Sequence, residues 1–536
     1  MKANRPYGAM AAWCVGFLFF TPCLWAQDAA APGHVGVPQD WSDHNVVFSL
    51  GELAQHPNLI NREPRVRHQL MQRFQEPGSN FFRGVDGGID SAAARDRDWN
   101  FNLVRGHIAA SMSPAKFSFD PAAPPSCTND YVVYGLNVTG GTGKQANLVA
   151  FNNLYAGTGG LCGATPSVMF AYNITTVTGS KVDLSPIISL DGTKIAFVES
   201  AATSAIFHVL TWTASQGTIT AAAAPTMTSL TYSPSATSTT SSPWIDYTND
   251  SVYVGADGGL MYKITGVFHG TPTLAGAPWP ITVSSGHHLS PPVLDSELGM
   301  LMVGSATGSL YQINTTNGAL AALVIGKPGI TGAGVVAPPL VDLTNGTTFV
   351  VSSNDGTSAV LVEVDTNTLT QLAKGRIGEG SSTGTALTIP QPAFSNDYYN
   401  EQPDGVIRLC GTGASDTTPW QYAFRFTGRT MNTTPVFSAQ LINAAATCTP
   451  WTEFYNPNIG GGTDFFFFGL TANCVGASGC VVERTTDIAP LVTAAVTGGP
   501  SGIVVDNYSA AGQASSIYLC AEGASTAYKF TQNGLQ

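Results

Sequence analysis

The sequence predicts an all-β fold, a β-propeller of about eight four-stranded blades, with seven as the alternative, behind a non-repeat N-terminal lead-in. Three observations support this: a proline landmark that recurs along the chain, short apolar runs bounded by Gly, Asn, Asp and Ser, and a charged content of only 11%. An average soluble domain has roughly 25% charged residues. A surface that is polar through hydroxyl and amide groups suits many short strands and turns.

The proline landmark is a small or polar residue followed by Pro and a short apolar strand. Subtracting neighbouring positions gives spacings of 72, 57, 48, 47, 54, 58 and 50 residues. A period of this length with several strands in each unit is typical of a propeller blade. The prolines are Pro114, Pro186, Pro243, Pro291, Pro338, Pro392, Pro450 and Pro500. Because Pro opens each strand, its missing N–H breaks no ladder bond. The irregular first interval leaves seven and eight blades open.

The clearest copy of the repeat is His287 to Leu320. It contains three apolar runs, at residues 292–294, 300–304 and 309–314, joined by Asp-Ser-Glu and Ala-Thr-Gly turns. Such turns join antiparallel strands because their residues accept positive φ or bond their own backbone. A similar second strand aligns in all eight units, from Tyr131 to Asn137 in the first to Ser516 to Glu522 in the last.

The last unit ends at its third strand, so a closed ring needs an outer strand from elsewhere. The lead-in offers Asn100 to Ile108 as the donor, which would remove two exposed sheet edges. In the rest of the lead-in, we expect Ala30 to Gln39 to be loose and Asn58 to Gln75 to be helical. The basic run Arg62 to Arg73 is interpreted as the solvated face of this helix, with an anion-binding helix as the alternative.

The N-terminus has the pattern of a secretory signal peptide. Lys2 and Arg5 precede an apolar run from Ala9 to Trp25, and Ala26 provides a small cleavage residue. The predicted division is therefore a signal peptide at 1–26, a lead-in at 27–112 and the propeller at 113–536. We expect an exported protein, periplasmic or extracellular, whose mature chain has no membrane span. The formal net charge of -12 argues against a nucleic-acid partner.

Seven cysteines follow the predicted signal peptide. Cys474 with Cys480 and Cys127 with Cys162 are the expected disulfides of an oxidising compartment. Cys410 and Cys520 occupy the same place in two repeats and are interpreted as small buried core residues. With an odd number, at least one thiol stays unpaired, and the pairing of Cys410, Cys448 and Cys520 is open. No metal-ligand spacing occurs, so we predict no metal site.

Two blades resemble the repeats of known propeller families. VLDSELGMLMVGSATGSLYQINTTNGAL, within His287 to Leu320, resembles the quinoprotein-like (PQQ-like) repeat, with its Gly-rich hairpin, Leu-Tyr strand and Asn-Gly turn. LSPIISLDGTKIAFVES, from Leu184 to Ser200, resembles the TolB-like repeat. The quinone-dependent members add a Trp late in each repeat and adjacent half-cystines. This chain has no Trp after Leu320 and no two adjacent cysteines, so no cofactor is predicted.

The resemblance implies that the loops entering each first strand and the loops between second and third strands share one face around a central channel. Conspicuous groups occur in these loops, and the candidates for the ligand face are His287, His288, Trp279, Trp420 and Asp416. The histidines suit ligand binding or proton transfer, or the capping of turn carbonyls. The tryptophans suit stacking on sugar rings, or the anchoring of loops.

The leading hypothesis is a secreted, non-enzymatic propeller that presents this face to a glycan or a protein partner. One alternative is an enzyme in the channel, either a quinone-dependent oxidoreductase or a polysaccharide hydrolase or lyase. The other is a structural component of an envelope or extracellular assembly.

Overall fold

The computed structural model describes part of the chain, and all of that part belongs to the unit Val35–Gln536. The described residues are 36–39, 46–73, 98–119, 125–157, 160–234, 239–378, 388–413, 418–456, 462–485, 491–506 and 516–531. The predicted signal peptide and Asp416 lie outside them.

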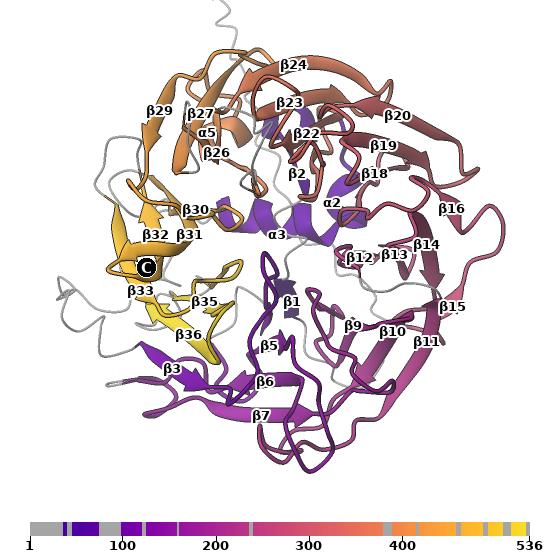
Figure 1. The fold of residues 1–536 in the computed structure, drawn as a ribbon, viewed down its shortest axis with the longest axis vertical. Helices are drawn as coiled ribbons and strands as arrows, with labels where there is room; N and C mark the ends of the chain where they lie inside the picture. The colour runs from indigo at the N-terminus through magenta and orange to yellow at the C-terminus, as the bar shows by residue number, and fades with distance from the viewer. Residues whose placement is uncertain are drawn as a thin grey trace, which may run out of the picture. The chain divides into compact units, whose positions relative to one another are not determined.

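Eight β-sheets are arranged around a common centre and form the blades of a β-propeller (Figure 1). The count is eight, and each proline landmark lies one to four positions before the inner strand of one blade. Blade one comprises β4 (Ala115–Phe119), β5 (Tyr131–Gly135), β6 (Leu148–Asn152) and β7 (Ser167–Tyr172), and blade two comprises β8 (Ile187–Ile188), β9 (Lys194–Ala201), β10 (Ser204–Thr211) and β11 (Met227–Ser233). Blade three comprises β12 (Trp244–Asp246), β13 (Ser251–Gly255), β14 (Leu260–Thr265), β15 (Thr273–Leu274) and β16 (Ile281–Thr282). Blade four comprises β17 (Val293–Asp295), β18 (Met300–Gly304), β19 (Ser309–Asn314) and β20 (Leu320–Val324).

The second half of the ring repeats this order. Blade five comprises β21 (Leu340–Asp342), β22 (Thr347–Ser352), β23 (Val360–Asp365) and β24 (Thr370–Arg376). Blade six comprises β25 (Ala393–Phe394), β26 (Val406–Thr412), β27 (Pro419–Thr427), β28 (Thr430–Met431) and β29 (Phe437–Gln440), with helix α5 (Asn396–Tyr399). Blade seven comprises β30 (Thr452–Asn456), β31 (Thr463–Val475), β32 (Ser478–Arg484) and β33 (Val492–Val496), and blade eight comprises β34 (Val504–Asp506), β35 (Ser516–Cys520) and β36 (Thr526–Thr531).

The second strand of a blade is packed on both faces, which explains its continuous apolar sequence. All residues of β13 and β35 are buried, whereas the outer strand β20 is mostly exposed. The small residue at the strand's end makes room for the chain entering the next blade. A Cβ on Gly304 would lie 2.2 Å from the Val335 carbonyl oxygen, and one on Gly469 would lie 2.3 Å from Pro500 Cγ.

The eighth blade takes its outer strand from the lead-in. Strand β3 (Trp99–Asn102) pairs antiparallel with β36, from Trp99 opposite Lys529 to Asn102 opposite Thr526. The Trp99 ring lies 6.1 Å from Tyr518 of blade eight and 6.1 Å from Phe151 of blade one, between ring centroids. The segment at which we expected ring closure thus also packs across the junction between the first and last blades.

Two further lead-in strands lie inside the ring. Strand β1 (Gly36–Gln39) pairs antiparallel with the inner strand β4, and β2 (Val46–Val47) pairs parallel with the inner strand β21. The expectation that Ala30 to Gln39 is loose is therefore wrong for residues 36–39. The chain needs no strong strand pattern there, because an inner sheet edge supplies the backbone partners.

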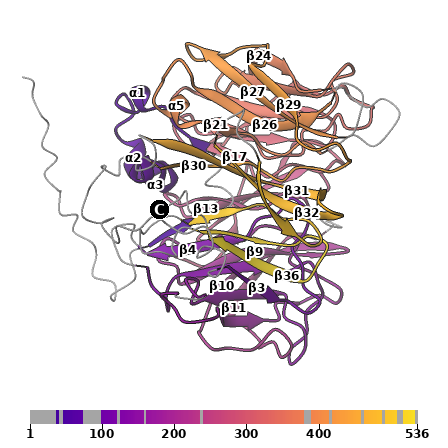
Figure 2. The same ribbon diagram turned by 90° about the vertical axis from the view of Figure 1, so that its left-hand side faces the viewer.

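Three short helices follow, α1 (Leu50–Leu53), α2 (Leu59–Arg62) and α3 (Pro64–Arg73). In Figure 1, α3 crosses the centre of the ring, and Figure 2 shows all three helices on one side of the blades. Helix α3 contacts β2 and β30, so it links the inner strands of separate blades.

Two arginines of α3 are buried, which corrects the interpretation of the basic run as a solvated face. Arg65 donates from Nη2 to the Ile245 carbonyl oxygen at 2.9 Å, and its guanidinium lies 4.3 Å from the Trp244 ring centroid. Arg73 pairs with Glu453, with Nη2 2.6 Å from Oε2, and lies 3.5 Å over the Tyr399 ring. The helix is held at both ends by arginines that already have acidic or aromatic partners.

Three disulfides are present among the described residues. Cys127–Cys162 and Cys474–Cys480 are confirmed. Cys410 and Cys520 are buried and are not bonded to each other, as interpreted. Cys410 is bonded to Cys448, a pairing that the sequence left open, and Cys520 is a free thiol. The bond from Cys410 links the second strand of blade six to the segment entering blade seven, a contact that sequence spacing does not show. Within the described part of the chain, no helix has the length and apolar content needed to cross a membrane.

Candidate functional site

The two faces of the ring differ in what covers them. Antiparallel pairing puts the segments that enter the inner strands, and the loops between second and third strands, at one end of each blade, which we call the entry face. The turns between first and second strands form the opposite turn face. The lead-in helices contact the turn face, where Arg62 Nη2 donates to the Ser296 carbonyl oxygen at 3.3 Å and Ser49 N–H donates to Thr344 Oγ1 at 2.6 Å.

A cavity of about 280 Å³ lies where the entering segments converge. Its lining comes from several blades and contains no charged side chain. The apolar part includes Met112, Val336 and Ile389. The other lining residues are Ala110, Ser111, Ser113, Ser185, Thr240, Ser242, Pro291, Ala337, Pro338, Thr388, Pro390, Gln391, Pro450, Thr452 and Ile503.

The serines beside the proline landmarks join neighbouring blades at this cavity. Ser113 N–H donates to Ser185 Oγ at 2.9 Å, and Ser185 N–H donates to Ser242 Oγ at 3.1 Å. The Ser242 hydroxyl also lies 3.3 Å from the Met112 sulfur. The Met112 backbone carbonyl in turn accepts a hydrogen bond from Gly502 N–H at 2.9 Å. The small polar residue of the landmark therefore has a structural role, and its hydroxyl oxygen is already engaged.

The two histidines lie on the entry face but outside this cavity. His287 and His288 are both exposed. His288 Nδ1 lies 2.7 Å from Asp257 Oδ1, in the loop between the second and third strands of the preceding blade. The pair thus links blades three and four at the surface.

The two tryptophans differ in exposure. Trp279 is only 8% exposed and packs on Tyr253, with ring centroids 5.4 Å apart. It is part of the core between blades and has little surface to offer a ligand. Trp420 is half-buried at the start of β27, opposite Gly411, and its Nε1 has no hydrogen-bond partner among the described residues. Trp420 thus keeps part of its ring exposed on the entry face.

A serine, a histidine and a glutamate lie in line in blade two. Ser229 Oγ is 2.9 Å from His208 Nδ1, and His208 Nε2 is 2.8 Å from Glu199 Oε2. Glu199 also accepts from Thr176 N–H at 2.7 Å and from the Ser180 hydroxyl. Burial opposes ionisation, but these hydrogen bonds lower the pKa of Glu199 to about 2. Neither cavity is lined by these residues, and the network fastens the segment entering blade two.

A carboxylate pair lies at the channel below α3, where a smaller cavity of about 70 Å³ is found. Burial, together with the neighbouring Glu453, raises the pKa of Asp464 well above its usual range. Glu453, however, is bonded to Arg73 through two oxygens, at 2.6 and 3.1 Å. An acid pair in which one carboxylate is held by arginine is a structural anchor and is poorly suited to hydrolysis.

The sequence candidates do not converge. None of His287, His288, Trp279 and Trp420 lines the 280 Å³ cavity, and Asp416 lies outside the described residues. Sequence reasoning missed Met112, Val336 and Ile389. The proline landmark could have identified these residues, because the segments that precede the inner strands must meet at the centre of a ring.

Comparisons with known proteins support the fold. No family model and no curated protein sequence matches the chain. Among solved structures, it is similar to a structure titled as the Dos1 propeller, with 11% identity over 81% of this chain and 94% of that one, at a TM-score of 0.50. It is also similar to BamB from Moraxella catarrhalis, with 15% identity over 81% and 98% of the two chains, at a TM-score of 0.44.

Proposed function

We propose that the protein is an exported, non-enzymatic propeller that binds a protein partner at the entry-face cavity. The observation that carries this is the uncharged 280 Å³ cavity at the convergence of the blades. The lead-in helices occupy the turn face, so a ligand approaches from the entry face. The three disulfides support the proposal of an oxidising, exported location.

The lining chemistry favours an apolar protein side chain over a glycan. Met112, Val336 and Ile389 offer apolar surface, and the hydroxyls of Ser185 and Ser242 already accept hydrogen bonds from the backbone. No aromatic ring lines the cavity on which a sugar could stack. Full burial of one aliphatic or aromatic side chain stabilises a complex by about 1.5–3 kcal/mol.

The test is a displayed peptide library and a glycan array, each applied to the purified mature protein and to Val336→Glu. Val336 is 43% exposed, so the substitution places a charge at the cavity with little effect on packing. We expect selected peptides to lose at least about tenfold in affinity. The matched control is Val492→Glu on the outer strand β33, where the residue is 60% exposed, and its binding should be unchanged. Equal binding by both variants would place the site elsewhere.

A glycan site at Trp420 is the second candidate. Its support is the half-buried ring with an indole N–H that lacks a partner among the described residues. Glycan binding that is lost in Trp420→Ala and kept in Val336→Glu and His287→Ala would favour this site over the cavity.

The resemblance of two blades to quinoprotein-like and TolB-like repeats stays a prediction. A channel enzyme of the quinone type would show dye reduction after quinone and calcium are added to the purified protein. Our proposal expects no such activity.

A further inference from the structure

A lysine and an aspartate meet in the interior where the ring closes. Lys116 Nζ lies 2.9 Å from Asp506 Oδ2, and both side chains are fully buried, at 0% exposure. Lys116 belongs to β4, the inner strand of the first blade, and Asp506 ends β34, the inner strand of the last. The two residues are separated by 506 − 116 = 390 positions, so their contact spans the whole ring.

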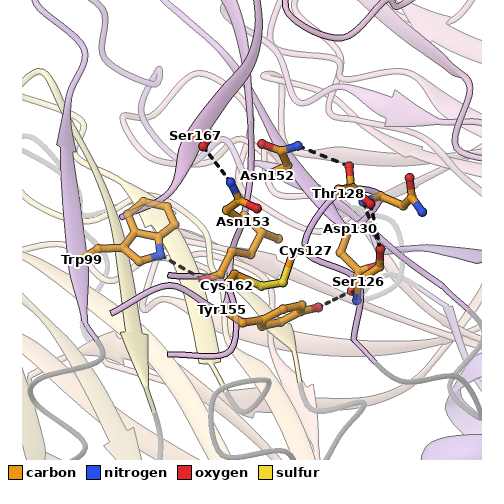
Figure 3. The surroundings of a disulfide bond; sticks show 12 residues. Trp99, Ser126, Cys127, Thr128, Asp130, Asn152, Asn153, Tyr155, Cys162 and Ser167 are labelled. Carbon is orange, nitrogen blue, oxygen red and sulfur yellow. Dashed lines mark hydrogen bonds between the residues drawn. A yellow bond between two sulfur atoms is a disulfide. The ribbon is translucent and has the colours of Figure 1, made fainter. Parts of the chain in front are cut away.

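The environment of this pair is dry and contains a second carboxyl group. Asp130 is 2% exposed, and Tyr155 and Tyr518 are 1% and 0% exposed. The Tyr155 hydroxyl donates to Asp130 Oδ2 at 2.5 Å, beside the Cys127–Cys162 disulfide (Figure 3). Burial raises the pKa of Asp506 to about 6, although Lys116 and Tyr155 act in the opposite direction. Asp506 is therefore protonated more readily here than an aspartate in water.

The 2.9 Å approach of Lys116 Nζ to Asp506 Oδ2 places the amine beside the carboxyl carbon to which that oxygen is bonded. Neither Asp506 carboxyl oxygen has a hydrogen-bond partner of normal geometry among the described residues, despite the 2.9 Å approach of the amine. Reacting atoms held about 3–3.5 Å apart in a fixed orientation gain a large rate advantage over the same groups in solution. A charged pair in a low-dielectric interior also gains from any step that removes both charges.

We propose that Lys116 and Asp506 form an intramolecular isopeptide bond that joins the first blade to the last. Proton transfer within the pair gives a neutral amine and a neutral carboxylic acid. The Lys116 nitrogen then forms a bond to Asp506 Cγ, the Cγ–OH bond breaks, and the hydroxyl leaves with one amine proton as water. In this proposal Asp130, whose carboxyl group accepts from the Tyr155 hydroxyl, relays that proton. No oxidant, reductant or co-reactant is needed.

The test is mass spectrometry of the purified, reduced and digested protein. We expect the peptides containing Lys116 and Asp506 to appear as one branched species, lighter than their sum by one water, and trypsin not to cleave after Lys116. The internal control is Lys374 with Asp355, an ion pair at 2.8 Å whose lysine is 43% exposed. Its peptides should appear separately at their full masses.

Three variants test how the bond between Lys116 and Asp506 forms. Asp506→Ala should abolish the branched species, and Asp506→Asn should keep it with loss of ammonia instead of water. Asp130→Asn should leave a large unreacted fraction. Should a variant fail to fold, the wild-type digest still decides the question. Separate wild-type peptides at full mass, with cleavage after Lys116, would overturn the proposal and leave a simple buried ion pair.

Discussion

Asp295 is a buried carboxyl group that contributes to the response of this protein to pH. It is fully buried at the end of β17, where Oδ1 accepts from Glu297 N–H at 3.0 Å and Leu298 N–H at 2.9 Å. Its Oδ2 has no hydrogen-bond partner among the described residues. Burial, with a smaller contribution from Asp342, raises the pKa of Asp295 to about 7.

A buried carboxyl group with a raised pKa stabilises the fold only while it is protonated. The contribution of Asp295 is complete below about pH 4, the pKa of the unfolded chain, and is lost as the pH rises through about 7. We expect Asp295→Asn to raise the melting temperature more at pH 8 than at pH 5, because the cost of the buried charge grows between these pH values. Thermal unfolding at the two pH values checks this, with the 66% exposed Asp404→Asn as the control. A gain that is the same at both pH values would contradict the assignment.

Arg73 provides a second test at this scale. Its removal leaves Glu453 buried without its cation, and breaking a buried pair in this way costs about 3–5 kcal/mol. We therefore expect Arg73→Met to lower the free energy of unfolding by about that amount, measured by denaturant titration. Arg67→Met, at an exposed position of the same helix, should change it by less than about 0.5 kcal/mol.

The partners of such residues could not be predicted from the sequence. Arg73 meets Glu453 across 380 positions, and Arg65 meets Ile245 across 180. A local charge pattern carries no information about contacts at that separation, so a basic run on a short helix was interpreted as solvated. The cavity residues Met112 and Val336 were missed for the same reason, since they meet only when the ring closes.

At the scale of elements, inner strands could be predicted because each begins with a proline landmark, and second strands because they are apolar throughout. The predicted run from Val406 to Thr412 coincides with β26. Strands β1 and β2 could not be predicted, since they have four and two residues and depend on partners 70 or more positions away. Strand β3 was anticipated because the sequence of the last repeat was expected to supply only three strands.

The importance of β3 is tested by two truncations. Deletion of residues 27–97 removes β1, β2 and the helices, whereas deletion of 27–104 also removes β3. We expect the second to lower the melting temperature clearly more than the first, because it exposes the edge of β36 and removes the buried Trp99. Equal melting temperatures, measured by circular dichroism, would show that β3 is dispensable for closure.

The disulfides allow a comparison within one chain. Cys410–Cys448 closes a separation of 38 residues and Cys474–Cys480 one of 6. Loop-closure entropy predicts that Cys410→Ala with Cys448→Ala costs about 1–2 kcal/mol more stability than Cys474→Ala with Cys480→Ala. Denaturant unfolding of the two double variants measures the difference, and a larger loss from the six-residue loop would contradict the entropic account.

At the scale of the whole molecule, the lead-in ties distant blades together. Arg65 contacts blade three, Ser49 blade five, and Arg73 both Asn396 of blade six and Glu453 of blade seven. Strand β3 completes blade eight. The ring is therefore braced from its turn face by the segment that precedes it in the sequence, and the partner is proposed to bind at the opposite entry face.

The position of β3 also has a consequence for the time at which the protein can fold. Domains generally begin to fold from the N-terminus as the chain is made. Here residues 99–102 are made long before residues 526–529, with which they pair. A chain whose synthesis stops before residue 526 therefore cannot complete the ring through this strand pair.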